Sequence, residues 1–403
     1  MLMIHTFSVI NYGSIRDEVT LDLRIPGTAP DLACFRRSVA TPDLRLPTVA
    51  VLMGPNGSGK TTLLRALVDL GRIVSSPTNA VELLPFLSSQ TRWEPTRFAL
   101  EGEGDFLAPG ETPQRFRYEL AVGRQPMEDG TAGPLYVSHE ALVHFPRGRR
   151  RRLLERQTPG APVYVSRDLG LGARDDRLKA IEPNRSAISI LALLNVPVAT
   201  RFARAMGDSL VNASNISGNE TFTPTTSTVI GWLEASEDAR QWAQAQIQRS
   251  DLGIEGMEVV DGFGDKLIRF NHSGLDTPIL LDFESKGTRR LLHLLPLIKF
   301  ALDVTGLTIL DEIDGELHVD MLAEILSWFR SRESNPRDAQ LLVSSHHVGL
   351  LDDLEKEEVF VVEKDGSGAT RLYGAQDVRG LRRDVRLYPK YRGGVLGGLP
   401  RFG

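Results

Sequence analysis

The stretch that decides the fold is "VLMGPNGSGKTTLLRAL", residues 51–67. An apolar, β-rich run leads into three closely spaced glycines, and a helical pattern follows them, which is the context that the P-loop motif G-x-x-x-x-G-K-[ST] requires. Glycines let the backbone bend so that successive N–H groups converge on phosphate oxygens, and a helix N-terminus adds a positive dipole. The pattern predicts a phosphate-binding loop made by Asn56, Gly57, Ser58, Gly59, Lys60, Thr61 and Thr62.

Two side chains of this loop have chemical tasks beyond its shape. Lys60 is expected to reach the β- and γ-phosphates of a nucleotide, and the hydroxyl of Thr61 to hold Mg²⁺. The alternative is a glycine-rich turn that binds nothing. A match at every motif position, between a strand pattern and a helix pattern, disfavours that alternative.

A second acidic element follows much later, in "LTILDEIDGELH", residues 307–318. Four strand-forming residues end at Asp311 and Glu312, so we expect Asp311 to orient the metal ion and Glu312 to polarise an attacking water. An acidic turn capping the next helix is the alternative reading. The adjacent second carboxylate favours hydrolysis over simple phosphoryl transfer.

The stretch "LLVSSHHVGLLD", residues 341–352, is another apolar strand that ends in small polar residues and two histidines. A neutral imidazole at the strand end is suited to hydrogen-bond a γ-phosphate and respond to its loss. His346 is the better candidate because it lies nearest the strand end. A pair of surface histidines in a loop is the alternative.

The stretch "DFESKGTRRLL", residues 282–292, predicts a second helix N-terminus, opened by Gly287 and Thr288, with a kink at Pro296. A P-loop surrounds the phosphates from one side and leaves the outer face of the γ-phosphate bare. Two chains packed head to tail would place Ser285 and Gly287 on the neighbour's γ-phosphate. An ordinary helix capped by Ser or Thr is the alternative.

In this order, the four elements resemble those of ABC-type AAA-family ATPases from bacterial phage-defence and abortive-infection systems. The resemblance is to the RloA/AbiL-like branch, which is related to the ATPase core of OLD-family proteins. It also includes "SVINYGSIRDEVTLDL" near the start. It implies an α/β fold: an ABC-type P-loop NTPase head with a mixed sheet and flanking helices, carrying an inserted β-rich lobe and a helical subdomain.

The same resemblance implies ATP and Mg²⁺ as cofactors, a homodimer or higher homo-oligomer, and a separately encoded effector, with a nuclease as the candidate. It places Asn11 and Tyr12 near the nucleotide base. Two positions depart from the family pattern, because Glu316 and Val319 stand where Ser and Pro are usual. Gln90 is the candidate for the family's Q-loop glutamine.

The pattern along the whole chain predicts three structural parts. Residues 1–71 form the N-terminal half of the ATPase core and begin with a β-hairpin at 5–24. Residues 72–255 form the inserted lobe, β-rich to about 165 and helical from about 180. Residues 256–403 form the C-terminal half.

Composition limits the class of protein. The 403 residues are 41% hydrophobic and 25% charged, with a formal net charge of -5, as in ordinary globular proteins. The single cysteine, Cys34, excludes an internal disulfide and favours a reducing compartment. No signal-peptide pattern and no uncharged apolar run of roughly 18 residues is seen. We therefore expect a cytoplasmic protein without a membrane partner.

One basic run is not explained by the nucleotide motifs. "RGRRRRLLER", from Arg147 to Arg156, holds six arginines. They could bind phosphates of DNA or RNA, or they could form a solvated loop or pair with an acidic protein face. No aromatic residues are interleaved with them in sequence, so base stacking has no support at this level.

These observations leave three functions in competition. The first is a Mg²⁺-dependent ATPase whose ATP-bound dimer switches a defence effector. The second is a scaffold that binds nucleotide and has negligible turnover, against which the Asp311–Glu312 pair argues. The third is a RecF-like DNA-repair ATPase with the same core chemistry and a different partner.

Overall fold

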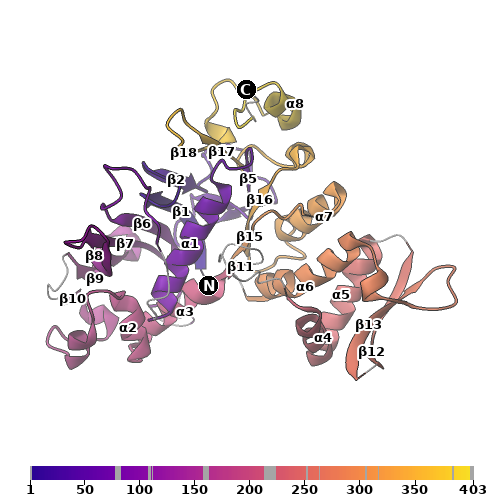
Figure 1. The fold of residues 1–403 in the computed structure, drawn as a ribbon, viewed down its shortest axis with the longest axis horizontal. Helices are drawn as coiled ribbons and strands as arrows, with labels where there is room; N and C mark the ends of the chain where they lie inside the picture. The colour runs from indigo at the N-terminus through magenta and orange to yellow at the C-terminus, as the bar shows by residue number, and fades with distance from the viewer. Residues whose placement is uncertain are drawn as a thin grey trace.

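The chain folds around two large sheets (Figure 1). The computed structural model describes residues 2–77, 83–107, 110, 112–157, 163–212, 224–250, 253–262, 264–304, 306–315, 317–383 and 385–399.

The central sheet has six strands and carries the predicted motifs. Its order is β11 (Leu210–Asn212), β15 (Leu307–Leu310), β16 (Gln340–Ser345), β5 (Val49–Met53), β17 (Val359–Lys364) and β18 (Thr370–Gly374). The first five strands run parallel, and β18 pairs antiparallel with β17. Strands β15, β16 and β5 are buried throughout, as expected for parallel strands covered on both faces. The strands predicted at the three motifs are confirmed.

Strand β5 shows how the sheet divides the interior into two cores. Ala50 and Leu52 belong to one hydrophobic cluster, and Val49, Val51 and Met53 belong to the other. Successive side chains of a strand point to opposite faces, so this alternation places one core on each side of the sheet. Helix α1 (Lys60–Ser75) packs in the first core. Helices α6 (Lys286–Val304) and α7 (Val319–Arg330) pack in the second.

The second large sheet is antiparallel, in the order β10-β9-β8-β7-β6-β1-β2. Its strands are β1 (Leu2–Ile10), β2 (Val19–Asp22), β6 (Thr96–Gly104), β7 (Gln114–Pro126), β8 (Ala132–His144), β9 (Arg151–Arg156) and β10 (Tyr164–Val165). The predicted N-terminal hairpin is confirmed, with Val9 opposite Val19. Strand β1 also pairs with β6 along its whole length. The β-rich segment after residue 72 therefore extends the N-terminal sheet.

The helices between 187 and 250 are divided between two places. Helices α2 (Ala187–Leu193) and α3 (Pro197–Ser209) pack against α1. Helices α4 (Thr226–Ala235) and α5 (Glu237–Ser250) pack on α6, beside a small sheet of β12 (Ile254–Gly262), β13 (Asp265–His272) and β14 (Ile279–Leu280). Figure 1 shows this second group as an arm on the right. Domain boundaries at 71/72 and 255/256 stay a prediction.

The remaining elements are short: β3 (Phe35–Arg37), β4 (Arg45–Pro47), α8 (Leu387–Arg392) and several 3-10 turns. A reciprocal contact joins the two large sheets, since Gln340 accepts a hydrogen bond from Ile4 N at 2.7 Å and donates to Ile4 O at 3.0 Å. Among the described residues, no single helix has the length and apolarity to cross a membrane, although α2 and α3, bent by 112°, pass that test as a pair.

Candidate active site

The P-loop runs from the end of β5 to the start of α1, as its sequence predicts. Two of its glycines are required by close contacts. A Cβ on Gly54 would lie 2.1 Å from Val362 O, and one on Gly59 would lie 2.1 Å from Thr370 Oγ1. Gly59 also has φ 109°, in the left-handed region that disfavours other residues. The loop's tight path therefore depends on both glycines.

Lys60 is folded back into its own loop. Its Nζ donates to Gly54 O at 2.7 Å and to Pro55 O at 3.1 Å, and it lies 3.4 Å from His346 Nδ1. Burial lowers the pKa of Lys60, and nearby carboxylates, Asp311 foremost, oppose that shift. The ammonium is thus held inside the loop by carbonyl partners that a phosphate could replace.

The outer wall of the P-loop comes from both ends of the chain. Thr370 of β18 donates to Ser58 O at 2.9 Å, and its N–H donates to Ser14 O at 2.8 Å. The hydroxyl of Ser14 lies 2.8 Å from Thr370 Oγ1 and donates to Thr62 Oγ1 at 3.3 Å. Nothing in the P-loop motif indicates Ser14 or Thr370, and the sequence reading missed both.

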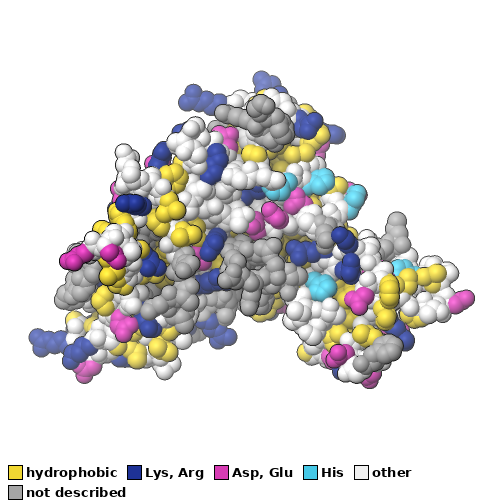
Figure 2. All heavy atoms as spheres, in the orientation of Figure 1, with side chains coloured by type: hydrophobic (Ala, Val, Ile, Leu, Met, Phe, Trp, Pro, Cys, Tyr) yellow, Lys and Arg dark blue, Asp and Glu magenta, His cyan; other side chains and the backbone are white. Residues whose placement is uncertain are grey.

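The acidic pair stands at the same edge of the sheet. In the parallel ladder Ser345 lies opposite Met53, so β16 and β5 end together, and Leu310 lies opposite Val343, so β15 ends two residues earlier at the same edge. Figure 2 shows acidic and histidine side chains gathered on this face, beside the start of α7. The predicted residues of three separate motifs are therefore brought together.

Ser344 forms a hydrogen bond with each residue of the acidic pair. Its hydroxyl donates to Asp311 Oδ1 and accepts from Glu312 N at 2.8 Å. Asp311 is 5% exposed, whereas the side chain of Glu312 is 66% exposed and has Oε1 3.9 Å from His346 Nε2. Glu312 has φ 49°, a strained conformation of the kind that clusters at functional sites. The carboxylate of Asp311 is therefore buried and fixed, whereas that of Glu312 is exposed to solvent.

Asp314 ties the acidic turn to the histidine. Its Oδ2 accepts hydrogen bonds from His346 N at 2.7 Å and from Ser345 Oγ at 3.1 Å. His346 therefore contacts Lys60, Glu312 and Asp314, whereas the backbone N–H of His347 donates to Ser345 Oγ. The sequence reading overlooked Asp314, although a third carboxylate just past a strand end was a usable signal.

The predicted signature residues occupy a different place. Helix α6 begins at Lys286, and Ser285 caps it by accepting from Thr288 N at 3.0 Å. Pro296 lies inside this helix. A hollow of about 200 Å³ lies at the helix start, and it is lined by Ile247, Ser250, Ser285, Gly287, Thr288, Leu291, Leu317, His318 and Met321. Phe283, just before the helix, is 80% exposed.

The residues expected to hold the metal fit Mg²⁺ by donor chemistry. Thr61 is an exposed residue in the first turn of α1, and Asp311 directly follows strand β15 of the same sheet as β5. Oxygen donors of this kind, completed by phosphate oxygens and water, are what Mg²⁺ prefers. Asp311 lies close enough to Lys60 to oppose the lowering of its pKa.

The residues placed near the base by resemblance have structural bonds. Asn11 is buried; its Nδ2 donates to Thr91 O and Glu94 O, and its Oδ1 accepts from Phe86 N. Tyr12 is 3% exposed and donates to Asp69 Oδ2 at 2.5 Å. Their side-chain polar atoms bond the protein itself, so we assign them a role in holding residues 83–95 and α1. Gln90 lies in an exposed turn of that segment, and Glu316 lies outside the described residues.

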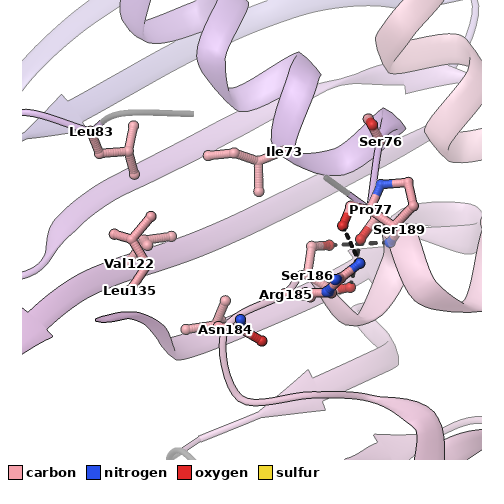
Figure 3. Close-up of a pocket in the computed structure, with 11 residues that line it drawn as sticks. Ile73, Ser76, Pro77, Leu83, Val122, Leu135, Asn184, Arg185, Ser186 and Ser189 are labelled. Atoms are coloured by element: carbon pink, nitrogen blue, oxygen red, sulfur yellow. Dashed lines mark hydrogen bonds between the residues drawn. The ribbon is translucent and has the colours of Figure 1, made fainter. Parts of the chain in front are cut away.

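A separate cavity, shown in Figure 3, lies at the other end of α1 from Lys60. Leu83, Val122 and Leu135 form its apolar wall, and Arg185 reaches across to Pro77 O. Its volume is about 30 Å³, room for roughly one water molecule. It is too small for a nucleotide. The hydrogen bond from Arg185 to Pro77 O joins the end of α1 to the segment before α2.

Comparison with known proteins identifies the family. A family model described as "AAA domain, putative AbiEii toxin, Type IV TA system" matches residues 49–352, about three quarters of the chain. The chain belongs to this family. The matched range contains the P-loop, the signature residues, the acidic pair and His346. No curated protein matches the sequence.

A solved structure supports the fold, and a second similar one has a lower score. The SMC head bound to the C-winged helix domain of ScpA is similar, with 14% identity, a TM-score of 0.51, and coverage of 92% of this chain and 97% of that one. The SMC head of Pyrococcus furiosus with an extended coiled coil is 13% identical, with a TM-score of 0.47 and coverage of 97% and 98%. The predicted fold class, an ABC-type P-loop ATPase head, is confirmed.

Proposed function

We propose that the protein is a Mg²⁺-dependent ATP hydrolase whose ATP-bound state is a head-to-tail homodimer. Membership of the AAA family and the ABC-type head fold support the conclusion that the chain binds nucleotide and is an ATPase-type enzyme. Dimerisation, the metal and the assignment of each site residue are the new parts of the proposal.

The division of the site into two halves carries the proposal. Lys60, Glu312 and His346 form one contact chain at the edge of the central sheet. Ser285 and Gly287 instead line the hollow with residues of α5 and α7. A triphosphate in the P-loop would expose its terminal phosphoryl group, and a capped helix start beside an exposed Phe283 is suited to cover it from a second copy.

Within this site each residue has one task. Asn56 to Thr62 surround the phosphates, Lys60 neutralises the β- and γ-phosphates, and Glu312 orients and polarises the attacking water. Mg²⁺, held through Thr61 and Asp311, would neutralise charge on the transferred phosphoryl group. His346, fixed through its backbone by Asp314, hydrogen-bonds the γ-phosphate. Ser285 and Gly287 act on the partner's nucleotide.

The dimer is proposed as a switch for a separately encoded effector, with a nuclease as the candidate, in a cytoplasmic antiphage system. The family description, which names a toxin of a type IV toxin–antitoxin system, supports a place among such systems. To change from nearly all open to nearly all closed, ATP must favour the closed dimer by about 5.5 kcal/mol. Two triphosphates, each held from both sides, are a reasonable source of that energy.

The decisive test is Glu312→Gln, examined with ATP and Mg²⁺ by light scattering and phosphate release. Loss of the water-polarising carboxylate should stop turnover while leaving ATP bound, so a stable dimer should accumulate. Lys60→Ala is the matched control and should stay monomeric. A Glu312→Gln protein that binds ATP and remains monomeric at every concentration would contradict the dimer. Undiminished phosphate release would contradict the role of Glu312, and a wild-type protein without phosphate release would indicate the scaffold.

A further inference from the structure

The basic run lies at the outer edge of the antiparallel sheet. It spans a 3-10 turn (Pro146–Gly148) and β9, next to the edge strand β10 and the turn Arg167–Leu169. We call the exposed side chains of this region the edge patch: Arg147, Arg149, Arg150, Arg151, Arg152, Tyr164 and Arg167. None of them takes part in the nucleotide site described above.

The six arginines of the run do not act alike. Arg156 is 2% exposed and donates to three backbone carbonyls, those of Glu182, Pro183 and Arg185. It therefore holds the segment before α2 in place, and the sequence reading was wrong to group it with the others. The other five are exposed at the surface.

The edge patch has a local excess of positive charge on a chain whose net charge is -5. Arg152 pairs with Glu155, and Arg151 lies 3.9 Å from Asp168. Within the described part of the chain, no carboxylate lies within ion-pair distance of Arg147, Arg149 or Arg150. Exposed guanidinium groups without a carboxylate partner, close together in one turn, are suited to bind the phosphates of a nucleic-acid backbone.

Strand pairing brings an aromatic residue from outside the basic run next to its arginines. Tyr164 lies opposite Glu155 in the β10–β9 ladder, so its ring comes beside the basic run from beyond residue 156. The guanidinium of Arg152 lies 4.1 Å from the centre of that ring, and Tyr164 is still 44% exposed. Nucleic-acid bases stack on aromatic rings and on arginine planes of this kind.

From this juxtaposition we propose that the edge patch binds single-stranded nucleic acid. Arg147, Arg149 and Arg150 contact consecutive phosphates, and a base stacks on the Arg152–Tyr164 pair. A duplex keeps its bases stacked inside and could use only the arginines, which is why the exposed ring favours a single strand. This inference goes beyond the proposed function and does not depend on the head-to-tail dimer.

The test measures fluorescence anisotropy of labelled oligonucleotides, single-stranded DNA, single-stranded RNA and duplex DNA, over a range of salt concentrations. Arg147→Ala/Arg149→Ala/Arg150→Ala should weaken binding and reduce the slope of log affinity against log salt by about 2 for single strands. The control is Arg379→Ala/Arg382→Ala/Arg386→Ala, which removes the same charge from exposed C-terminal positions and should leave both unchanged. Arg147→Lys/Arg149→Lys/Arg150→Lys keeps the three positive charges and should therefore retain the salt slope.

Tyr164→Ala separates stacking from charge. It should weaken single-strand binding about 5- to 150-fold while leaving the salt slope and duplex binding unchanged. Thermal melting confirms that each variant is folded. An unchanged slope in the edge-patch triple variant, equal losses in the C-terminal control, or competition by polyglutamate as strong as by an oligonucleotide would overturn the proposal. So would Tyr164→Ala binding single strands as well as the wild type.

Discussion

The two halves of the candidate site are built differently. At the sheet edge, Ser344, Asp314 and His346 cross-connect two strand ends, and each polar group is held by a neighbour. At the start of α6, Ser285 bonds Thr288 of its own helix. The first half is fixed before any ligand arrives, and the second presents a helix start, a hollow and an exposed phenyl ring. In the proposed head-to-tail dimer, the first half would supply the hydrolysis chemistry of its own chain and the second half would complete the site of the partner.

The largest effect is expected for Lys60→Ala. Removing the buried ammonium deletes the charge that neutralises the β- and γ-phosphates, so ATP affinity should fall and turnover should drop by at least about 100-fold. Isothermal titration and phosphate release measure the two losses. Full retention of ATP binding would mean that the P-loop half is not the nucleotide site.

Gly287→Arg tests the other half. A long side chain at the start of α6 should prevent the partner's phosphate from approaching, so turnover should be lost while ATP binding by the monomer survives. Equimolar mixing with Lys60→Ala provides the sharper result. In a head-to-tail dimer of the two variants, the Gly287→Arg chain supplies an intact Lys60 and the Lys60→Ala chain supplies an intact Gly287 to the same site. Each mixed dimer then has one intact site, which should recover part of the activity.

The mixing experiment also has a clear negative outcome. If Gly287 served the nucleotide of its own chain, neither variant could restore the other, and the mixture would stay as inactive as its parts. Lys286→Ala is the control, since shortening an exposed neighbouring side chain should leave dimerisation largely intact.

A smaller effect is expected for Asp314→Asn. The amide keeps the shape but weakens the acceptor that fixes the backbone of His346, so turnover should fall about 10-fold with little change in ATP affinity. Asp320→Asn, at a side chain that is 90% exposed, is the matched control. A loss of affinity equal to the loss of turnover would indicate that Asp314 acts on binding and not on the histidine.

The smallest effect lies outside both halves, at His139 and Glu119 on the antiparallel sheet. A hydrogen bond at 3.4 Å raises the pKa of His139 and lowers that of Glu119 to about 2, with Arg117 also bonded to Glu119. The stability from the histidine is complete below about pH 6.5 and is lost as pH rises through its higher folded pKa. Because both groups are about one-third exposed, it is worth about 0.5 kcal/mol.

Glu119→Gln checks this assignment. The pKa of His139, followed by NMR, should fall toward its ordinary value, and the small decrease in melting temperature above about pH 6.5 should disappear. ATP turnover should not change, because neither residue touches the nucleotide site. A pKa for His139 that is the same in the variant would remove Glu119 as the cause.

Local patterns predicted the parts of the fold that depend on neighbours in sequence. The strand–glycine–helix order at 49–75 and the apolar strands before Asp311 and His346 each have one favourable structure, and the protein contains all three. The pairing of β1 with β6 depends on residues about ninety positions apart, and no local pattern specifies it. For the same reason, Tyr164 beside Arg152 and Thr370 against the P-loop could not be predicted.

The contact of Thr370 with Ser58 and Ser14 has a consequence for the integrity of the P-loop. The motif lies in one short stretch of sequence, yet its outer wall includes a residue about three hundred positions further along the chain. A chain that stops before β18 has the motif without the wall. A fragment that is meant to keep an intact P-loop must therefore include β18 as well as the motif itself.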